Sequence, residues 1–280
     1  TFLPNGQTPA AGQTVRLPHH AKTLKEIAST GTNSFYRGRL AERIHDYAIT
    51  SGGWIRKEDL QRHKNSWVEP VSFDWRGLRL HEIPPNGQGL AAQIALGILE
   101  HTPAMDLPQD CADSLHLQIE AMKLAFADAH RYIADPNHLD CDPFALLDPN
   151  YLALRAKKIN PGTAQNFGHG KPATGGTVYL ATADENGNMV SFIQSNYMGF
   201  GSGVVVEETG IALQNRGFGF TLQKDHPNSA APDKRPFHTI IPGFVTKNGD
   251  ALMSFGVMGG HVQPQGHMQM MLRMFGHDQN

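Results

Sequence analysis

The chain has 280 residues, of which 40% are hydrophobic and 18% charged, and its formal net charge at pH 7 is -2. These values exclude a disordered chain and give no reason to expect a nucleic-acid or membrane partner. No apolar run approaches the ~20 residues that a membrane helix needs, no signal peptide opens the chain, and two cysteines make no disulfide framework. We therefore expect a soluble protein in a reducing setting. The cytoplasm is favoured, and the periplasm stays open because we expect the natural chain to begin before Thr1.

The first part of the chain is predicted to be mainly helical. Residues 21–30 carry apolar side chains on one helical face, and Gly31 supplies a stop. A second helix is predicted from about Ser34 to Gly52, and another carries Leu90, Ile94 and Ile98 at helical spacing. Between these two helices, residues 69–83 alternate around Arg76-Gly77, a pattern typical of a β-hairpin.

Residues 115–134 show the longest helical periodicity in the chain. The predicted apolar face consists of Leu115, Ile119, Met122, Phe126 and Ile133. His116 and Glu120 lie off this face, four residues apart, which is a spacing that could serve a metal ion. Because no third ligand is indicated, we interpret both as part of a solvated helix face.

The chain changes character at residues 160–176, which contain almost no large apolar side chain and predict a mobile linker. A hairpin follows, with the turn-forming Asn186-Gly187 at its tip. The predicted strands of this second half cover residues 178–183, 189–195, 210–213, 240–246 and 251–257, and a final helix covers residues 263–275. Helices in the first half and strands in the second predict an α+β fold, with helices packed on a sheet.

Thr177 stands between this linker and the first strand of the hairpin, directly after Gly175-Gly176. A threonine hydroxyl is a weak nucleophile, but it is activated when the α-amine of the same residue serves as the base. That arrangement requires cleavage of the chain before Thr177. Glycines tolerate the local strain of such a cleavage, and a mobile segment would let the released end move away. Taken alone this order of residues is a weak signal, because many loops end in Gly-Gly-Thr.

The segment GGTVYLATADENGNMVSFIQSNYMGFGSG, followed by TGIALQNRGFGF, KRPFHTIIP and GVMGGHVQPQG, resembles the γ-glutamyltransferase family of N-terminal-nucleophile hydrolases. Upstream, FLPNG, EPVSFDWRG, PPNGQG and EAMKLAFADAHRY resemble the end of that family's large subunit. The resemblance implies a four-layer αββα sandwich. It also implies self-cleavage into two subunits and acyl transfer from γ-glutamyl compounds such as glutathione to water or an amine, without a metal or cofactor.

The same resemblance assigns roles to individual residues. Thr177 matches the catalytic threonine that starts the small subunit, and Ser195 matches a hydroxyl residue that hydrogen-bonds to it. Gly259 and Gly260 match the glycines whose N–H groups form the oxyanion hole, where one donor contributes ~3 kcal/mol to lowering the barrier. Asn215 matches a position near the substrate.

Other positions depart from the family pattern and bear on the substrate. Tyr197 stands where the family usually has Asn, Arg216 where it has Gln, and Gly219 where it has an Asp that pairs with the donor's ammonium group. His238 and Thr239 replace two serines. Without the Asp and with a nearby cation, a glutaryl group matches better than a γ-glutamyl group, as in the cephalosporin-acylase-like branch of the family. A surface or structural ion pair is the other interpretation of Arg216.

On this basis residues 1–176 are predicted to be part of a large subunit that ends in the linker 160–176, and residues 177–280 part of a small subunit. The expected partners are the remainder of both subunits, a glutaryl or γ-glutamyl donor, and water or an amine acceptor. The arginine that would bind the substrate carboxylate in the family is not located in this chain.

The main alternative is an unprocessed or truncated homologue without activity. A dinucleotide site at residues 199–203 and a metal hydrolase using His238, His261 and His267 are poorer interpretations.

Overall fold

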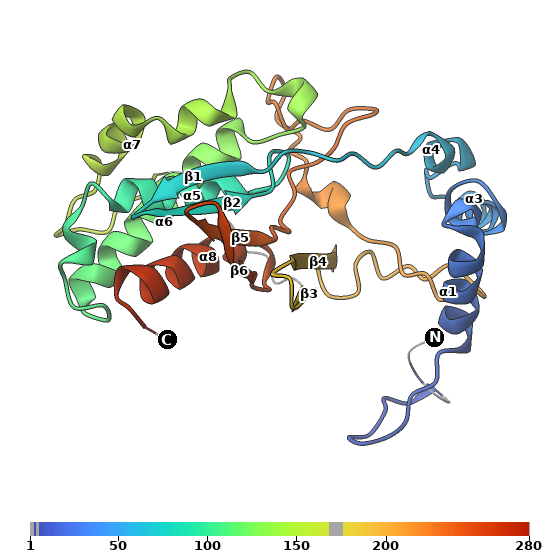
Figure 1. The fold of residues 1–280 in the computed structure, drawn as a ribbon. Coiled ribbons are helices and arrows are strands. Elements are labelled where there is room, and N and C mark those ends of the chain that lie inside the picture. Colours follow the sequence, from blue (N-terminus) through green and yellow to red (C-terminus); the bar gives the residue numbers. More distant parts are fainter. Residues whose placement is uncertain (1–2, 4–5, 168–175, 280) are drawn as a thin grey trace. The chain divides into compact units, whose positions relative to one another are not determined.

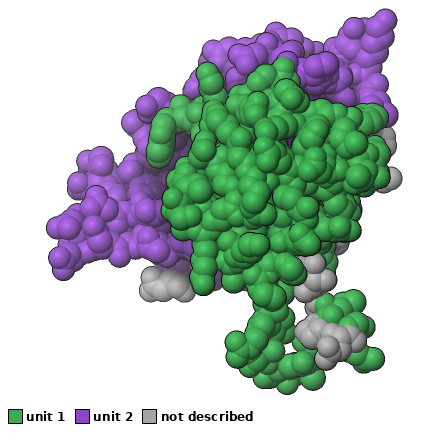
Figure 2. Space-filling view, turned by 90° about the vertical axis from the view of Figure 1, so that its right-hand side faces the viewer, with its two compact units in different colours: residues 1–67, 200–214 green, residues 68–199, 215–280 purple. Residues whose placement is uncertain are grey.

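The computed structural model describes residue 3 and residues 6–167 and 176–279 (Figure 1). The chain divides into two compact units, which Figure 2 shows in different colours. The smaller unit contains residues 1–67 and 200–214, and the larger contains residues 68–199 and 215–280. These units do not bear on the predicted subunit boundary before Thr177, which concerns cleavage and stays a prediction.

Four helices form most of the smaller unit: α1 (Pro18–Thr30), α2 (Asn33–Tyr36), α3 (Arg39–Thr50) and α4 (Lys57–Arg62). The prediction of one helix from Ser34 to Gly52 is wrong, because the chain breaks at Arg37-Gly38 between α2 and α3. At this break Gly38 has φ -110° and ψ -147°, which is not a helical conformation. Helix α4 was not predicted.

Residues 200–214 belong to the smaller unit and contact its helices. The hydroxyl of Thr23 donates to the carbonyl of Thr209 at 2.8 Å, and Arg43 forms an ion pair with Glu208 at 2.7 Å. The strand predicted over residues 210–213 is absent from this described segment, which has one isolated bridge between Val205 and Ala212. Gly210 has a φ of 71°, which ends any extended run there.

The larger unit contains a four-stranded antiparallel sheet in the order β1-β2-β5-β6. Its strands are β1 (Val71–Trp75), β2 (Leu78–Glu82), β5 (Gly243–Lys247) and β6 (Asp250–Phe255). The predicted hairpin at Arg76-Gly77 is confirmed, and so is the hairpin at Asn248-Gly249. Both turns use two consecutive left-handed residues, which match the twist of the flanking strands.

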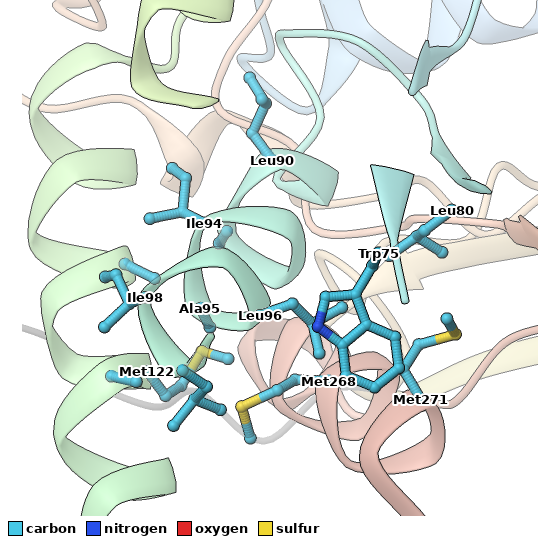
Figure 3. Close-up of a cluster of buried hydrophobic side chains, with 14 of the residues drawn as sticks. Trp75, Leu80, Leu90, Ile94, Ala95, Leu96, Ile98, Met122, Met268 and Met271 are labelled. Carbon is cyan, nitrogen blue, oxygen red and sulfur yellow. The ribbon is translucent and has the colours of Figure 1, made fainter. Parts of the chain in front are cut away.

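The core of this unit lies between the sheet and its helices (Figure 3). Helix α5 (Gly89–Leu99) is buried along its whole length and packs against β1, β2 and three helices: α6 (Ala112–Tyr132), α7 (Pro149–Ala156) and α8 (Gln263–Met271). Short turns of 3-10 helix cover Pro103–Met105, Pro136–His138, Pro143–Leu147, Arg216–Gly219 and Gly260–Val262, and a π-helical turn covers Leu272–Gly276. Trp75, Leu80 and Ile94 are fully buried here. Burying a large apolar side chain stabilises the fold by about 1.5–3 kcal/mol relative to leaving it exposed.

The predicted orientation of α6 is wrong in part. Ile119, predicted to be in the core, is 53% exposed, whereas Glu120, predicted to be solvated, is fully buried. The cause is the chain that follows α7, because the N–H of Gln165 donates to Glu120 at 3.2 Å and covers it. His116 bonds to the carbonyl of Asn160 at 2.8 Å, so it shares no metal with Glu120. Of the predicted linker, residues 168–175 lie outside the described residues.

The third hairpin consists of β3 (Gly176–Ala183) and β4 (Met189–Tyr197), as predicted. It lies beside β6, where the hydroxyl of Ser191 donates to the carbonyl of Phe255 at 3.1 Å. The mixed α+β class is confirmed, and the four-layer sandwich stays a prediction. No helix in the described part of the chain is both long and apolar enough to span a bilayer.

Candidate active site

Thr177 lies at an irregularity in the β3–β4 hairpin. Gly176 pairs with Tyr197 and Val178 pairs with Gln194, so β4 places two residues, Ser195 and Asn196, opposite Thr177. Such a β-bulge redirects the side chains around it and is common at functional sites. The structure therefore brings Thr177 and Ser195, which the sequence analysis connects, to facing positions of neighbouring strands.

Tyr197 follows the bulge in an uncommon backbone conformation. Its φ is 80°, in the left-handed region that aromatic residues rarely adopt. The hydroxyl of Ser195 accepts a hydrogen bond from the N–H of Tyr197 at 2.8 Å and supports this conformation. The Tyr197 side chain is 4% exposed, so the strained residue is held inside the protein.

Arg216 is a buried cation packed on Tyr197. Its guanidinium carbon lies 5.1 Å from the centroid of the Tyr197 ring, within the range of a cation–π interaction. Its Nη1 donates to the hydroxyl of Thr239 at 2.7 Å. Burial lowers the pKa of Arg216 to about 10, so the side chain is still charged at pH 7. The structure thus gathers three of the predicted substrate-binding residues into one contact group.

His238 lies next to this cation but does not add charge to it. Burial, and next the charge of Arg216, lower the pKa of His238 to about 3. The ring accepts a hydrogen bond from the N–H of Ile240 at 3.3 Å, as a neutral imidazole does. Arg216 is therefore the positive group of the pair at neutral pH.

Asn215 supports the chain on both sides of Tyr197. Its N–H donates to the carbonyl of Asn196 at 3.2 Å, and its side-chain oxygen accepts from the N–H of Met198 at 3.1 Å. The predicted role of Asn215 near the substrate is thus joined to a structural one, because it holds the turn that carries Tyr197.

Gly219 is closely packed against backbone. A Cβ at this position would lie 2.6 Å from the carbonyl oxygen of Phe237. Asn228 fixes this approach, since its amide donates to the carbonyl of Gly219 at 2.7 Å and its oxygen accepts from the N–H of Phe237 at 2.9 Å. An acidic side chain at position 219 therefore requires movement of the backbone.

Gly259 and Gly260 follow β6 in conformations that suit glycine, with φ values of 132° and 61°. Two contacts tie this segment to β4: the one between Ser191 and Phe255, and one between the Tyr197 hydroxyl and His261 Nε2 at 3.2 Å. Ser191 and Tyr197 on β4 are as far apart in sequence as Phe255 and His261 on the other segment. The two contacts bracket the stretch of β4 that contains Ser195 and the stretch after β6 that contains the two glycines.

Two residues of this region were not among the predicted catalytic or substrate-binding residues, although His261 was considered for a metal hydrolase. His261 stacks on Phe237 with ring centroids 5.8 Å apart, and burial lowers its pKa. Gln88 is fully buried, and its side-chain amide donates to the carbonyls of Thr239 at 2.7 Å and Gly260 at 2.9 Å. Gln88 lies in the PPNGQG segment that carries part of the family resemblance, but that resemblance assigned it no role.

In the part of the chain that the structure describes, no group of three or more His, Cys, Asp or Glu side chains is arranged to hold a metal ion. His267, one of the histidines considered for a metal hydrolase, is bonded to Glu82 at 2.6 Å in the core. Burial raises the pKa of Glu82.

The chain is similar to known proteins along its whole length. A family model described as Gamma-glutamyltranspeptidase matches residues 1–280. The "Glutathione hydrolase-like YwrD proenzyme" of Bacillus subtilis is 36% identical over 273 residues, which are 98% of this chain and 52% of that protein. The "Oxamate amidohydrolase proenzyme" of Klebsiella pneumoniae is 41% identical over 265 residues, which are 95% of this chain and 50% of that protein.

Among solved structures, a cephalosporin acylase from Bacillus halodurans matches with a TM-score of 0.88 and 49% sequence identity. The match covers 99% of this chain and 50% of that one. The chain therefore spans about half the length of the relatives that it matches.

Proposed function

Because the chain belongs to the γ-glutamyltranspeptidase family of N-terminal-nucleophile hydrolases, we propose that it carries the nucleophile and oxyanion loop of an amide hydrolase or acyltransferase. The observation that carries this proposal is the position of Thr177 opposite the Ser195 bulge, with β4 bound to the segment of Gly259 and Gly260. The relatives named as proenzymes support cleavage before the nucleophile.

In the proposed mechanism, cleavage of the Gly176–Thr177 bond frees the α-amine of Thr177. That amine takes the proton of the Thr177 hydroxyl as the oxygen attacks the donor carbonyl, and Ser195 orients the hydroxyl. The N–H groups of Gly259 and Gly260 hold the negative oxygen of the tetrahedral intermediate. The amine of the donor leaves, and water or an acceptor amine then releases the acyl group from Thr177. None of these steps requires a metal or organic cofactor.

The proposed donor carries a carboxylate on its acyl group, as glutaryl and γ-glutamyl amides do. Arg216, buried and charged, is the proposed partner of that carboxylate, with Tyr197, Asn215, His238 and Thr239 around it. Position 219 has no room for an acidic partner of a donor ammonium group, so a glutaryl donor is preferred over a γ-glutamyl donor.

Oxamate and similar short amides form a second class of candidate donor. The relative named as an oxamate amidohydrolase is 41% identical, and oxamate also joins a carboxylate to an amide, over a shorter distance. A short donor of this kind is proposed as the alternative substrate for the same nucleophile.

The nucleophile is tested in the full-length protein by intact mass and by hydrolysis of glutaryl-p-nitroanilide. The wild type should give two polypeptides, the second beginning at Thr177. Thr177→Ala should stay uncut and lose activity by at least a thousandfold. Thr182→Ala, which removes a threonine hydroxyl elsewhere on the same strand, is the matched control and should still be cut and active. An uncut wild type with equal activity in Thr177→Ala would establish the non-catalytic alternative.

The donor is tested by comparing kcat/KM for a glutaryl amide, a γ-glutamyl amide and oxamate itself. Arg216→Gln, which removes the cation, should lower the value for the glutaryl donor about 10- to 100-fold, since a charge-assisted hydrogen bond contributes about 1.5–3 kcal/mol. A strong preference of the wild type for the γ-glutamyl donor would refute the role assigned to Arg216 and Gly219.

The four-layer αββα sandwich is the proposed architecture of the complete fold. Helices cover one face of the β1-β2-β5-β6 sheet in this chain, which accounts for part of such a sandwich. The remaining layers and the remainder of both subunits are proposed to come from residues outside this chain.

A further inference from the structure

Gln88 joins the two parts of the proposed site through one side chain. It precedes α5 and is fully buried. Its Nε2 donates both of its hydrogens, to the carbonyl of Thr239 at 2.7 Å and to the carbonyl of Gly260 at 2.9 Å. We call this pair of hydrogen bonds the Gln88 clamp. One end of the clamp holds the segment that contacts Arg216, and the other holds the proposed oxyanion loop.

The loop that carries Gln88 is itself bound along the same segment. The N–H of Gln88 donates to the carbonyl of His238 at 3.0 Å, and the N–H of His238 donates to the carbonyl of Asn86 at 2.9 Å. The side chain of Asn86 donates to the carbonyl of Pro236 at 2.6 Å. Gln88 is therefore anchored before its side chain reaches across to Gly260.

The glycine loop needs an external support of this kind. Gly259 and Gly260 occupy successive conformations that few other residues adopt, and glycine has more backbone freedom than any other residue. The carbonyl of Gly259 is fixed by the N–H of Val262 at 3.2 Å, and the carbonyl of Gly260 is fixed by Gln88. With the peptide planes on both sides of Gly260 held, the direction of its N–H is set.

The clamp also connects this direction to the proposed carboxylate partner. The Thr239 carbonyl accepts from Gln88, while the Thr239 hydroxyl accepts from Arg216 at 2.7 Å. The hydrogen bonds that connect Gly260 through Gln88 and Thr239 to Arg216 join four buried residues.

We propose that Gln88 is a positioning residue that sets the distance and angle between the oxyanion loop and the cation that binds the donor carboxylate. The catalytic consequence rests on the proposed function. Because a donor of fixed length must place its carboxylate at one end and its reacting carbonyl at the other, an error in this distance affects both binding and the chemical step.

The chain offers a matched control at Gln93. Gln93 is also fully buried, and its Nε2 also donates to two backbone carbonyls, those of Val71 at 2.9 Å and Leu80 at 3.1 Å. These carbonyls belong to β1 and β2 in the core. The same substitution at Gln93 therefore removes two hydrogen bonds of the same kind, but none that involves the proposed site. Methionine is the substitute, because it keeps the length and unbranched shape of glutamine and removes both donors.

The experiment compares Gln88→Met and Gln93→Met in the full-length protein. Both variants should lower the melting temperature. Gln88→Met alone should lower kcat for glutaryl-p-nitroanilide about 10- to 100-fold and raise its KM several-fold, a smaller effect than losing an oxyanion donor outright. Gln93→Met should keep both constants within about twofold of the wild type. Equal kinetic effects of the two variants, or an unchanged kcat in Gln88→Met, would overturn the proposal.

Hydrogen exchange of residues 256–262 provides a reading that does not depend on activity. Gln88→Met should raise the exchange rate of this segment about tenfold or more over that of Gln93→Met, because the Gly260 carbonyl loses its partner. If the wild type proves inactive, the proposed function fails, and this comparison still decides whether Gln88 holds the loop. Equal exchange in both variants would show that it does not.

Discussion

Burial sets the charge of the ionisable side chains around Tyr197. It lowers the pKa of Arg216 only to about 10, so this side chain stays a cation, whereas it lowers the pKa of His238 to about 3. Burial lowers the pKa of both groups, and whether each is charged at pH 7 depends on its pKa in water. Arg216 is therefore a positive group beside a neutral His238 at pH 7.

His130 gives a prediction at the scale of a single residue. Burial, and next the neighbouring His261, lower its pKa to about 4, and its ring packs against Phe126 and Phe237. Between pH 4 and the ordinary value near 6.5, the unfolded chain binds a proton at this residue that the folded protein does not. Stability should therefore fall as the pH is lowered through this window.

His130→Phe should remove this contribution, because a phenyl ring fills the same aromatic contacts without titrating. The slope of unfolding free energy against pH should decrease by up to about 1.4 kcal/mol per pH unit between pH 6.5 and 4. Denaturant unfolding at several pH values measures the slope. In the variant, His238 should still contribute to the pH dependence, because its pKa is also lowered. An unchanged slope would mean that His130 is protonated in the folded protein.

At the scale of elements, the position of β3 depends on one close contact with the chain after β6. A Cβ on Gly256 would lie 2.5 Å from the ring of Tyr179, which stands two residues after Thr177. Since Tyr179 is also bonded to Ser191 at 3.0 Å, it cannot swing away without loss. The absence of a side chain at Gly256 thus lets the proposed nucleophile strand and the proposed oxyanion loop approach each other.

Gly256→Ala should destabilise the protein by about 1–3 kcal/mol, the usual cost of overpacking, and should slow cleavage before Thr177. Thermal unfolding and the time course of intact mass measure the two effects. Gly162→Ala serves as the control, because a Cβ on Gly162 would lie 3.6 Å from its nearest neighbour, the side-chain oxygen of Asn160, which is an ordinary contact. A Gly256→Ala variant with normal stability and normal cleavage would show that the two segments need not lie so close.

At the scale of the whole molecule, the hairpin of β3 and β4 presents an apolar outer face. Val178, Leu180, Val190 and Phe192 are 43–55% exposed, and Leu180 pairs directly with Phe192. An apolar group of this kind on a sheet face is typical of a surface that packs against another layer. The four-layer proposal places that layer in the part of the protein outside this chain.

In the full-length protein, Phe192→Asp should therefore destabilise by about 2 kcal/mol or more, since it buries a charge in the proposed interface between layers. Phe144→Asp is the control, because Phe144 is 56% exposed and lies outside the hairpin, so it should change stability by about 0.5 kcal/mol or less. Denaturant unfolding compares the two. Equal, small effects would mean that the outer face of the hairpin remains in water.

Local chemistry made several elements predictable. Arg76-Gly77 and Asn248-Gly249 adopt left-handed turns that join neighbouring strands whatever packs on them. In the hairpin at Asn186-Gly187 only Gly187 is left-handed, and this hairpin places Thr177 and Ser195 opposite each other. These contacts connect residues close in sequence, so turn type and strand register suffice to place them.

Helix α6 shows where such reasoning fails. Periodicity finds a helix and one apolar face, but α6 is covered on more than one side. The segment that covers Glu120 begins more than forty residues later, at Gln165, and nothing in the helical pattern indicates it. Glu120 is buried with an ion-pair partner in its own helix, Lys123, and a distant N–H donor, Gln165, so the rule that charged positions are solvated fails here.

Local patterns and motifs spread along the chain were enough to predict the three hairpins, helices α1, α5, α6 and α8, the α+β class, the family and the candidate nucleophile. Only the folded chain shows which side chains from distant parts of the sequence meet. Gln88 meets Gly260, and Tyr197 meets His261, across long stretches of sequence. Such contacts depend on how the sheet and helices bury one another, which no local preference specifies.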